Sequence, residues 1–195
     1  MIVIIALRYR FSFLRLPERN IIPDANVFLS PANGKIIAVI TGANDPVVKN
    51  HRTVVENAMK DTGTGSTMVS IMMTPLNVHY QRAPQTSKLI AQSYHTGTFL
   101  NAIASGLDAT FSNEYNAMLF ETPDHSKFKI LQIAGFLARR IVSFIEPKQS
   151  VKQGDVIGLI KFGSQVTIIF DNTVNIQAKV GDIVHEGLTV LATKK

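Results

Sequence analysis

Short apolar runs recur along the whole chain, and turn-forming residues separate them. The runs are rich in valine, isoleucine and phenylalanine, which favour strands, while the glycine, proline, asparagine and aspartate residues between them favour turns. The segments with this pattern are 27–30 (VFLS), 35–40 (KIIAVI), 68–73 (MVSIMM), 128–136 (FKILQIAGF), 156–163 (VIGLIKFG), 166–170 (VTIIF) and 188–192 (LTVLA). The pattern therefore predicts a protein built mainly from β-strands.

Helical patterns are few. Residues 51–60 combine helix formers with a charged face, and residues 97–107 have room for roughly two or three helical turns. Residues 63–66 (GTGS) are predicted to form a loop, because no lysine follows at the spacing that phosphate binding requires. We expect one α+β, predominantly β domain: a compact β-sandwich or barrel-like core with two short helices.

The last quarter of the chain contains a weak internal repeat. Residues 151–158 (VKQGDVIG) and 180–187 (VGDIVHEG) share a Gly-Asp turn followed by a short apolar run. This rhythm resembles the flattened sandwiches of lipoyl and biotinyl carrier domains. The place of their cofactor-bearing lysine is taken here by residues 162–165 (FGSQ), so a carrier function ranks last.

Composition narrows the classes of partner. The chain has a net charge of +6, a pI of about 9.7 and only 17% charged residues, so we expect an anionic partner. No zinc-finger, RRM or KH signature accompanies the charge, which disfavours nucleic acid. Cysteine is absent and the five histidines do not follow a metal-binding spacing, so we expect neither a thiolate nucleophile nor a metal site.

Residues 1–20 are predicted to form a basic, aromatic arm. The apolar run before Arg8 is far shorter than the roughly 20 residues that span a bilayer, and its charges follow the run instead of preceding it as in a signal peptide. Arg8, Arg10 and Arg15 alternate with aromatic and aliphatic side chains, a mixture typical of the membrane headgroup region. A first strand with alternating faces is the other interpretation.

Four motifs stand out against the β background: residues 30–36 (SPANGKI), 73–84 (MTPLNVHYQRAP), 132–142 (QIAGFLARRIV) and 158–166 (GLIKFGSQV). In this order and spacing they resemble the short, archaeal-type branch of the phosphatidylserine decarboxylase proenzymes. The resemblance extends from about Arg8 to the last strand.

The resemblance implies a self-cleaving chain. The Ser164 hydroxyl would attack the Gly163 carbonyl, and elimination would then separate residues 1–163 from 164–195 and leave a pyruvoyl group derived from Ser164. Glycine permits close approach to its carbonyl, and serine has the β-oxygen that both attacks and leaves. The pyruvoyl group accepts the electrons released with CO₂. His79, in the PLNVH motif, is the implied proton donor, and its ordinary pKa suits acid–base work.

Two residues depart from the family pattern. The first motif usually reads S-P-x-D-G, where the aspartate orients the histidine that activates the serine, but this chain has Asn33. Loss of such a carboxylate costs on the order of 10⁴ in a serine triad. The sequence offers Asp45, Asp108 and Glu114 as replacements. The second departure is Arg82, which stands where the longer bacterial branch has a further histidine, so His79 would serve both cleavage and decarboxylation.

The implied substrate is phosphatidylserine, converted to phosphatidylethanolamine and CO₂ by a peripheral protein on the cytoplasmic face of a membrane. Arg139 and Arg140 are candidates to bind the phosphodiester, since paired guanidiniums suit phosphate. A homodimer is compatible with the sequence. Two alternatives stay open: a pyruvoyl decarboxylase of a soluble amino acid, and an uncleaved pseudoenzyme that binds lipid or a partner.

Overall fold

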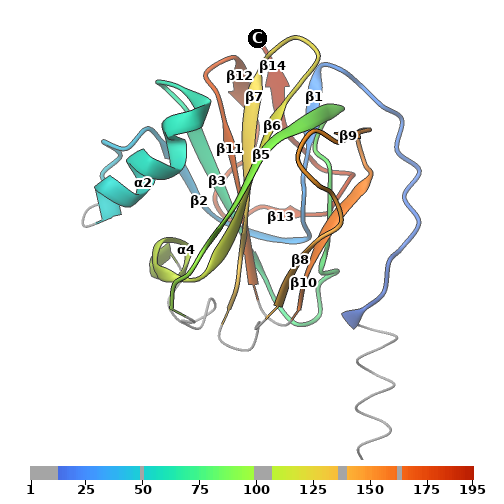
Figure 1. Cartoon of the computed structure of the whole chain (residues 1–195), viewed down its shortest axis with the longest axis horizontal. Coiled ribbons are helices and arrows are strands. Elements are labelled where there is room, and N and C mark those ends of the chain that lie inside the picture. Colours follow the sequence, from blue (N-terminus) through green and yellow to red (C-terminus); the bar gives the residue numbers. More distant parts are fainter. Residues whose placement is uncertain (1–12, 49–50, 99–106, 136–139, 162–163) are drawn as a thin grey trace, which may run out of the picture.

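The computed structural model describes residues 13–48, 51–98, 107–135, 140–161 and 164–195 (Figure 1). Its strands form three sheets with antiparallel pairing. The large sheet has the order β13 (Ile183–Val184), β2 (Gly34–Thr41), β3 (Thr67–Met73), β11 (Ser164–Phe170), β7 (Lys127–Ile133), β6 (Tyr115–Glu121), β5 (Ser87–His95) and β9 (Ser150–Val151). One small sheet contains β4 (Tyr80–Arg82), β10 (Val156–Lys161) and β8 (Arg140–Ser143), and the other contains β1 (Val27–Leu29), β14 (Val190–Lys194) and β12 (Val174–Ile176). The α+β, predominantly β prediction is therefore confirmed.

Two short α-helices, α2 (Arg52–Met59) and α4 (Leu107–Ser112), are found in the described part of the chain, and the 3-10 helix η3 (Lys60–Thr62) continues α2. The predicted helix at 51–60 is thus confirmed. The helix predicted at 97–107 has the wrong bounds. Residues 97 and 98 are not helical, and the described helix α4 starts at residue 107, where the predicted one ends. Residues 99–106 lie outside the described residues.

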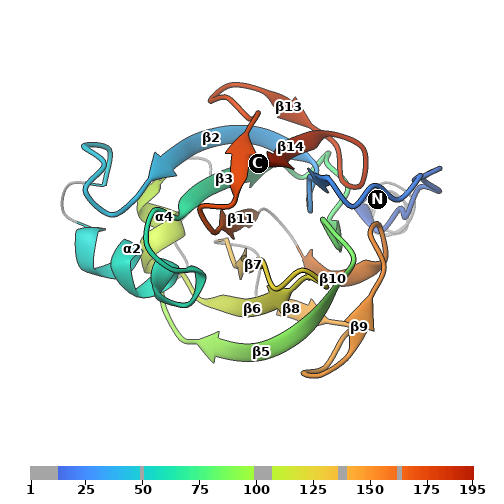
Figure 2. The ribbon, with the colours of Figure 1, turned by 90° about the horizontal axis from the view of Figure 1, so that it is seen from above.

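The large sheet is covered on both faces. Figure 2 shows it strongly curved, with the helices on its outer side and the two small sheets on its inner side. An outer core joins Val55 and Met59 of α2 to Ile40, Met68 and Ile169 of the sheet. A larger inner core lies on the other face and includes Phe28, Ile71, Phe128, Ile157 and Ile168.

Strand β11 contains the apolar run 166–170 and contributes side chains to both cores. Val166, Ile168 and Phe170 belong to the inner core, while Ile169 belongs to the outer one. Successive side chains of a strand point to opposite faces, so a strand buried on both faces has apolar residues at adjacent positions, as at Ile168, Ile169 and Phe170. It is a central strand, paired with β3 on one side and β7 on the other.

The internal repeat is a repeated turn. Lys152 N–H donates to Asp155 Oδ2 at 2.8 Å, and Lys179 N–H donates to Asp182 Oδ2 at 2.9 Å. Each aspartate fixes a tight turn immediately before a strand, β10 in the first copy and β13 in the second. The strands on either side of residues 162–163, β10 and β11, belong to different sheets, so this connection is not the tip of a hairpin.

Candidate active site

Ser164 is the first residue of β11, and its backbone is paired with Met73 at the end of β3. The preceding strand, β10, ends at Lys161 in a different sheet. The predicted scissile bond therefore lies in the connection from one sheet to the next. Gly163 itself lies outside the described residues.

The PLNVH motif forms the turn that follows β3. Asn77 Oδ1 accepts hydrogen bonds from Thr74 N–H at 2.7 Å and from Thr74 Oγ1 at 2.9 Å, which closes the turn. The His79 carbonyl then accepts the Ile160 N–H at 3.3 Å. Since Met73 pairs with Ser164 and His79 bonds to Ile160, the turn is tied to both strands that flank the predicted cleavage position.

The hydrogen bonds of His79 define its tautomer. Its Nδ1 lies 2.9 Å from the Asn77 carbonyl oxygen, which can only accept, so Nδ1 carries the proton. Nε2 then presents a lone pair. This atom is buried and has no hydrogen-bond partner among the described residues, and the whole side chain is 0% exposed. An imidazole held in this way is a neutral base.

Burial also sets the charge of His79. Burial lowers its pKa to about 4, the hydrogen bond to the Asn77 backbone opposes the shift, and the positive charge of Arg15 adds to it. The Phe13 ring stacks on the imidazole with centroids 3.9 Å apart. Arg15 Nη2 donates to the Leu76 carbonyl at 2.6 Å, so the segment that carries both residues is fastened to the same turn. His79 is therefore neutral at pH 7.

A chain of buried amides leads from His79 across the inner face of the fold. Gln81 Nε2 donates to the His79 carbonyl at 2.6 Å, Gln132 Nε2 donates to Gln81 Oε1, and Asn116 Nδ2 donates to Gln132 Oε1, the last two at 2.8 Å. The carbonyl at one end can only accept, so it fixes the orientation of every amide. Gly158 makes room for this chain, because a Cβ atom there would lie 2.4 Å from Gln132 Nε2.

Asn33 lies at the entry to β2, on the same end of the large sheet. Its side chain is 5% exposed, and its Oδ1 accepts the Glu186 N–H at 2.6 Å. The next residue, Gly34, approaches β3 so closely that a Cβ atom would lie 2.2 Å from the Met72 carbonyl oxygen. The glycine of the SPANG motif is thus needed for close packing beside the strand that pairs with Ser164.

The other predicted residues are placed as follows. Arg140 is exposed and begins β8, where it pairs with Lys161, the last residue of β10. Arg15 is described above, whereas Arg8, Arg10 and Arg139 lie outside the described residues.

The three carboxylates proposed as replacements for the family aspartate have other contacts. Asp45 accepts the N–H groups of Thr41 and Val47 within its own turn. Asp108 lies 2.9 Å from His51 Nε2, and Glu114 accepts a short hydrogen bond from the Tyr94 hydroxyl.

Sequence reasoning missed Phe13, the glutamines and Glu186. Gln81 and Gln132 lie inside the quoted motifs, so their positions were a usable signal. Phe13 and Glu186 lie far along the chain from the residues that they contact, and no local pattern marks them. In the described part of the chain, no cluster of three or more His, Asp or Glu side chains could hold a metal ion. No described helix is long and apolar enough to cross a membrane.

A family profile described as phosphatidylserine decarboxylase matches residues 8–192. A phosphatidylserine decarboxylase proenzyme of Magnetococcus marinus is 35% identical over 184 residues, which cover 94% of this chain and 77% of the relative. A Methanocaldococcus jannaschii protein, provisionally named archaetidylserine decarboxylase proenzyme, is 34% identical over 94% of this chain and 88% of its own length. A Chlorobium chlorochromatii proenzyme is 32% identical over 96% and 80%, respectively.

Proposed function

The chain belongs to the phosphatidylserine decarboxylase family, and we propose that it converts phosphatidylserine to phosphatidylethanolamine and CO₂ after cutting itself between Gly163 and Ser164. One observation carries the proposal: a buried, neutral imidazole with an unpartnered Nε2 is fastened to both strands that flank this bond. A buried acceptor left without a partner costs about 1–3 kcal/mol, so its retention indicates a functional role.

Maturation requires a base. In the proposed sequence His79 Nε2 takes the proton of the Ser164 hydroxyl, whose oxygen attacks the Gly163 carbonyl carbon. The amide bond breaks, the Ser164 nitrogen takes a proton, and an ester joins the two residues. Loss of the Ser164 α-proton then expels the Gly163 carboxylate. The remaining enamine takes up water and releases ammonia, which leaves a pyruvoyl group on residues 164–195.

The same histidine has a role in turnover. The pyruvoyl group supplies an electron sink for the electrons that leave with CO₂. In turnover His79 Nε2 would take a proton from the substrate ammonium group and return it to the α-carbon, and the burial of the ring keeps bulk water from this position. Stacking with Phe13 and the hydrogen bond to Asn77 hold the ring in one orientation. The site suits a pyruvoyl group because His79 Nε2 is buried and has no hydrogen-bond partner among the described residues, so this atom is available for proton transfer.

The lipid part of the proposal rests on charge and family. We place the phosphodiester near Arg139 and Arg140. We place residues 1–20 as a peripheral arm on the cytoplasmic face of the membrane, and the described part of this arm packs against the decarboxylase domain 21–195 through Phe13 and Arg19. The net charge of +6 supports an anionic surface as partner. A homodimer is compatible with this arrangement.

The test is a decarboxylation assay on vesicles that contain phosphatidylserine, run beside free serine and with Ser164→Ala as control. Release of CO₂ from the vesicles, lost in Ser164→Ala, supports the proposal. Turnover of free serine alone would favour the soluble-substrate alternative. An intact chain that binds the vesicles without releasing CO₂ would instead establish a lipid-binding pseudoenzyme.

A further inference from the structure

A buried charge cluster adjoins Asn33. Glu186 is 0% exposed, and its carboxylate accepts three hydrogen bonds from Arg19 at 2.9–3.1 Å. Arg82, 9% exposed, is the second guanidinium of the cluster. Burial lowers its pKa and the charge of Glu186 opposes that shift. Glu186 is therefore the buried anion among two buried or half-buried cations.

Asn33 is fixed to the backbone of this same glutamate. The Glu186 N–H can only donate, so the atom that faces it at 2.6 Å must be Asn33 Oδ1, and the orientation of the amide is determined. An aspartate at position 33 would keep this hydrogen bond and add a negative charge. Asn33 retains the bond without the charge, and the charge lies on the side chain of its hydrogen-bond partner.

The loop that carries Asn33 also contacts Arg82. The Arg82 N–H donates to the Pro31 carbonyl at 3.0 Å, and Arg82 Nη2 donates to the Pro17 carbonyl at 2.9 Å. Arg82 follows His79 by three residues, on the strand that begins directly after it. Arg82 therefore lies next to the loop of Asn33, and its strand, β4, begins directly after His79.

We propose that Glu186 supplies the carboxylate charge that the family has at position 33, and that it acts as a positioning residue for self-cleavage. The inference rests on the proposed function. When His79 takes the serine proton it becomes a cation, in a site where Arg15 already opposes positive charge. Glu186 offsets the positive charge of Arg19 and Arg82, and Arg82 lies three residues beyond His79, so we expect Glu186 to lower the cost of that cation.

A second carboxylate that acts on Arg82 lies outside the buried cluster. Asp155 also acts on Arg82, but it is exposed and its Oδ2 accepts the Lys152 N–H. Asp155→Asn is therefore the matched control, because it removes a carboxylate that acts on the same arginine from outside the buried cluster.

The experiment is a double-mutant cycle that moves the negative charge from position 186 to position 33. The rate of self-cleavage is measured by mass spectrometry for the wild type, Glu186→Gln, Asn33→Asp and the double variant, beside Asp155→Asn. The temperature is one at which the Ser164→Ala counterpart of every chain is fully folded. We expect cleavage to be about tenfold slower in Glu186→Gln, which corresponds to a change of about 1.4 kcal/mol in the activation barrier. The double variant, which returns the charge to position 33, should recover most of the rate.

Either of two results would overturn the inference alone: Glu186→Gln cleaved at the wild-type rate, or a double variant no faster than Glu186→Gln. A wild-type chain that never cleaves would overturn the proposed function and this inference with it. If Glu186→Gln does not fold, Arg19→Gln replaces it. That change leaves the carboxylate and removes a cation, so the proposal expects cleavage to be retained, whereas a purely structural ion pair predicts its loss.

Discussion

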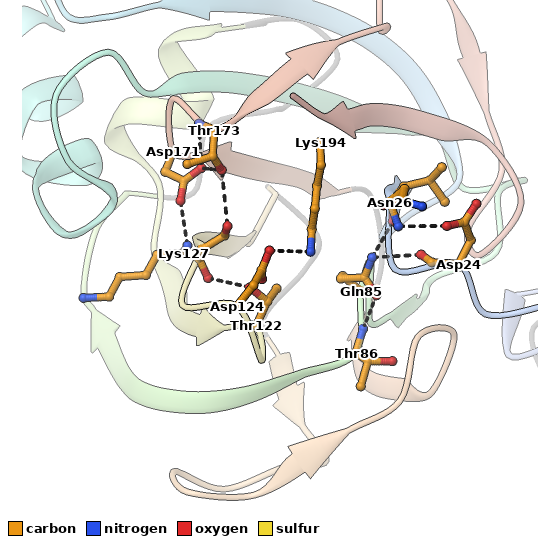
Figure 3. Close-up of polar contacts among 12 residues, drawn as sticks. Asp24, Asn26, Gln85, Thr86, Thr122, Asp124, Lys127, Asp171, Thr173 and Lys194 are labelled. Carbon is orange, nitrogen blue, oxygen red and sulfur yellow. Dashed lines mark hydrogen bonds and ion pairs between the residues drawn. The ribbon is translucent and has the colours of Figure 1, made fainter.

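At the Phe170 end of β11, polar side chains satisfy one another. Lys194 Nζ lies 2.6 Å from Asp124 Oδ2, and Asp171 accepts the N–H groups of Lys127 and Thr173 at 2.8 and 3.0 Å (Figure 3). These contacts fasten the β6–β7 turn to the strands that follow it.

The Ser164 end, roughly 20 Å away along the strand, differs. There His79 Nε2 and Arg82 Nε are buried and have no hydrogen-bond partner among the described residues. Polar side chains thus gather near both ends of the same central strand, β11. One end satisfies its polar groups and stabilises the fold, while the other keeps unsatisfied groups that chemistry can use. Substitutions at the Ser164 end should therefore slow self-cleavage, whereas substitutions at the Phe170 end should change stability alone.

The largest effect is expected at His79. Asparagine keeps a donor for the Asn77 carbonyl and removes Nε2, so His79→Asn should slow self-cleavage by about 10²–10⁴-fold. Stability should change by less than about 1 kcal/mol, because one unsatisfied buried atom is lost with the ring. Cleavage is followed by mass spectrometry and stability by urea unfolding of the Ser164→Ala counterparts. Cleavage at the wild-type rate would remove His79 from the mechanism.

The second effect concerns pH. In the folded chain the pKa of His79 is lowered from 6.5 to about 4, so the folded state binds fewer protons than the unfolded state between these values. The free energy of unfolding is therefore highest above about pH 6.5. It falls by an amount on the order of 3 kcal/mol as the pH drops toward 4. Ser164→Ala should show this loss, and Ser164→Ala with His79→Asn should lack it. Parallel stability curves for the two chains would contradict the buried, neutral imidazole.

The amide chain gives the third effect. Gly158→Ala places a Cβ atom 2.4 Å from Gln132 Nε2 and 2.7 Å from the Val142 carbonyl oxygen. Overpacking of this kind costs about 1–3 kcal/mol, and it displaces the amide that leads through Gln81 to His79. Both stability and cleavage rate should fall. An unchanged midpoint of urea unfolding would show that the inner face tolerates the added methyl group.

The smallest effect is expected at the opposite end. The hydrogen bond from Lys194 is the largest cause that lowers the pKa of Asp124 to about 2, with a smaller contribution from Thr122. The resulting stability is present above about pH 4 and is lost as the pH falls toward 2. Asp124 is about half exposed, so solvent screening holds the effect of Lys194→Met below about 1 kcal/mol. Cleavage should be unaffected, and a slower cleavage in this variant would contradict the separation of the two ends.

The sequence was sufficient for strands whose composition is unambiguous. The apolar runs at 35–40, 68–73 and 166–170 lie within β2, β3 and β11, and each of these strands contributes side chains to both cores. Strands β5 and β6 were missed. β6 reads YNAMLFE and includes the helix formers alanine, methionine and leucine, so its strand conformation depends on pairing with β5 and β7.

The same distinction applies to the candidate site. Motif order identified the segments of Ser164, His79 and Asn33, and the structure places these segments at one end of the large sheet. The stack of Phe13 on His79 and the bond between Asn33 and Glu186, which are 153 residues apart, depend on tertiary packing that no local pattern encodes. The replacement carboxylate could therefore be found only in the folded chain.

The most direct test of self-cleavage is the intact mass of freshly purified wild-type protein under denaturing conditions. Self-cleavage between Gly163 and Ser164 predicts two fragments, residues 1–163 and 164–195, and the N-terminus of the shorter fragment should react as a carbonyl. A single uncut chain of 21.4 kDa that stays uncut on incubation would contradict it.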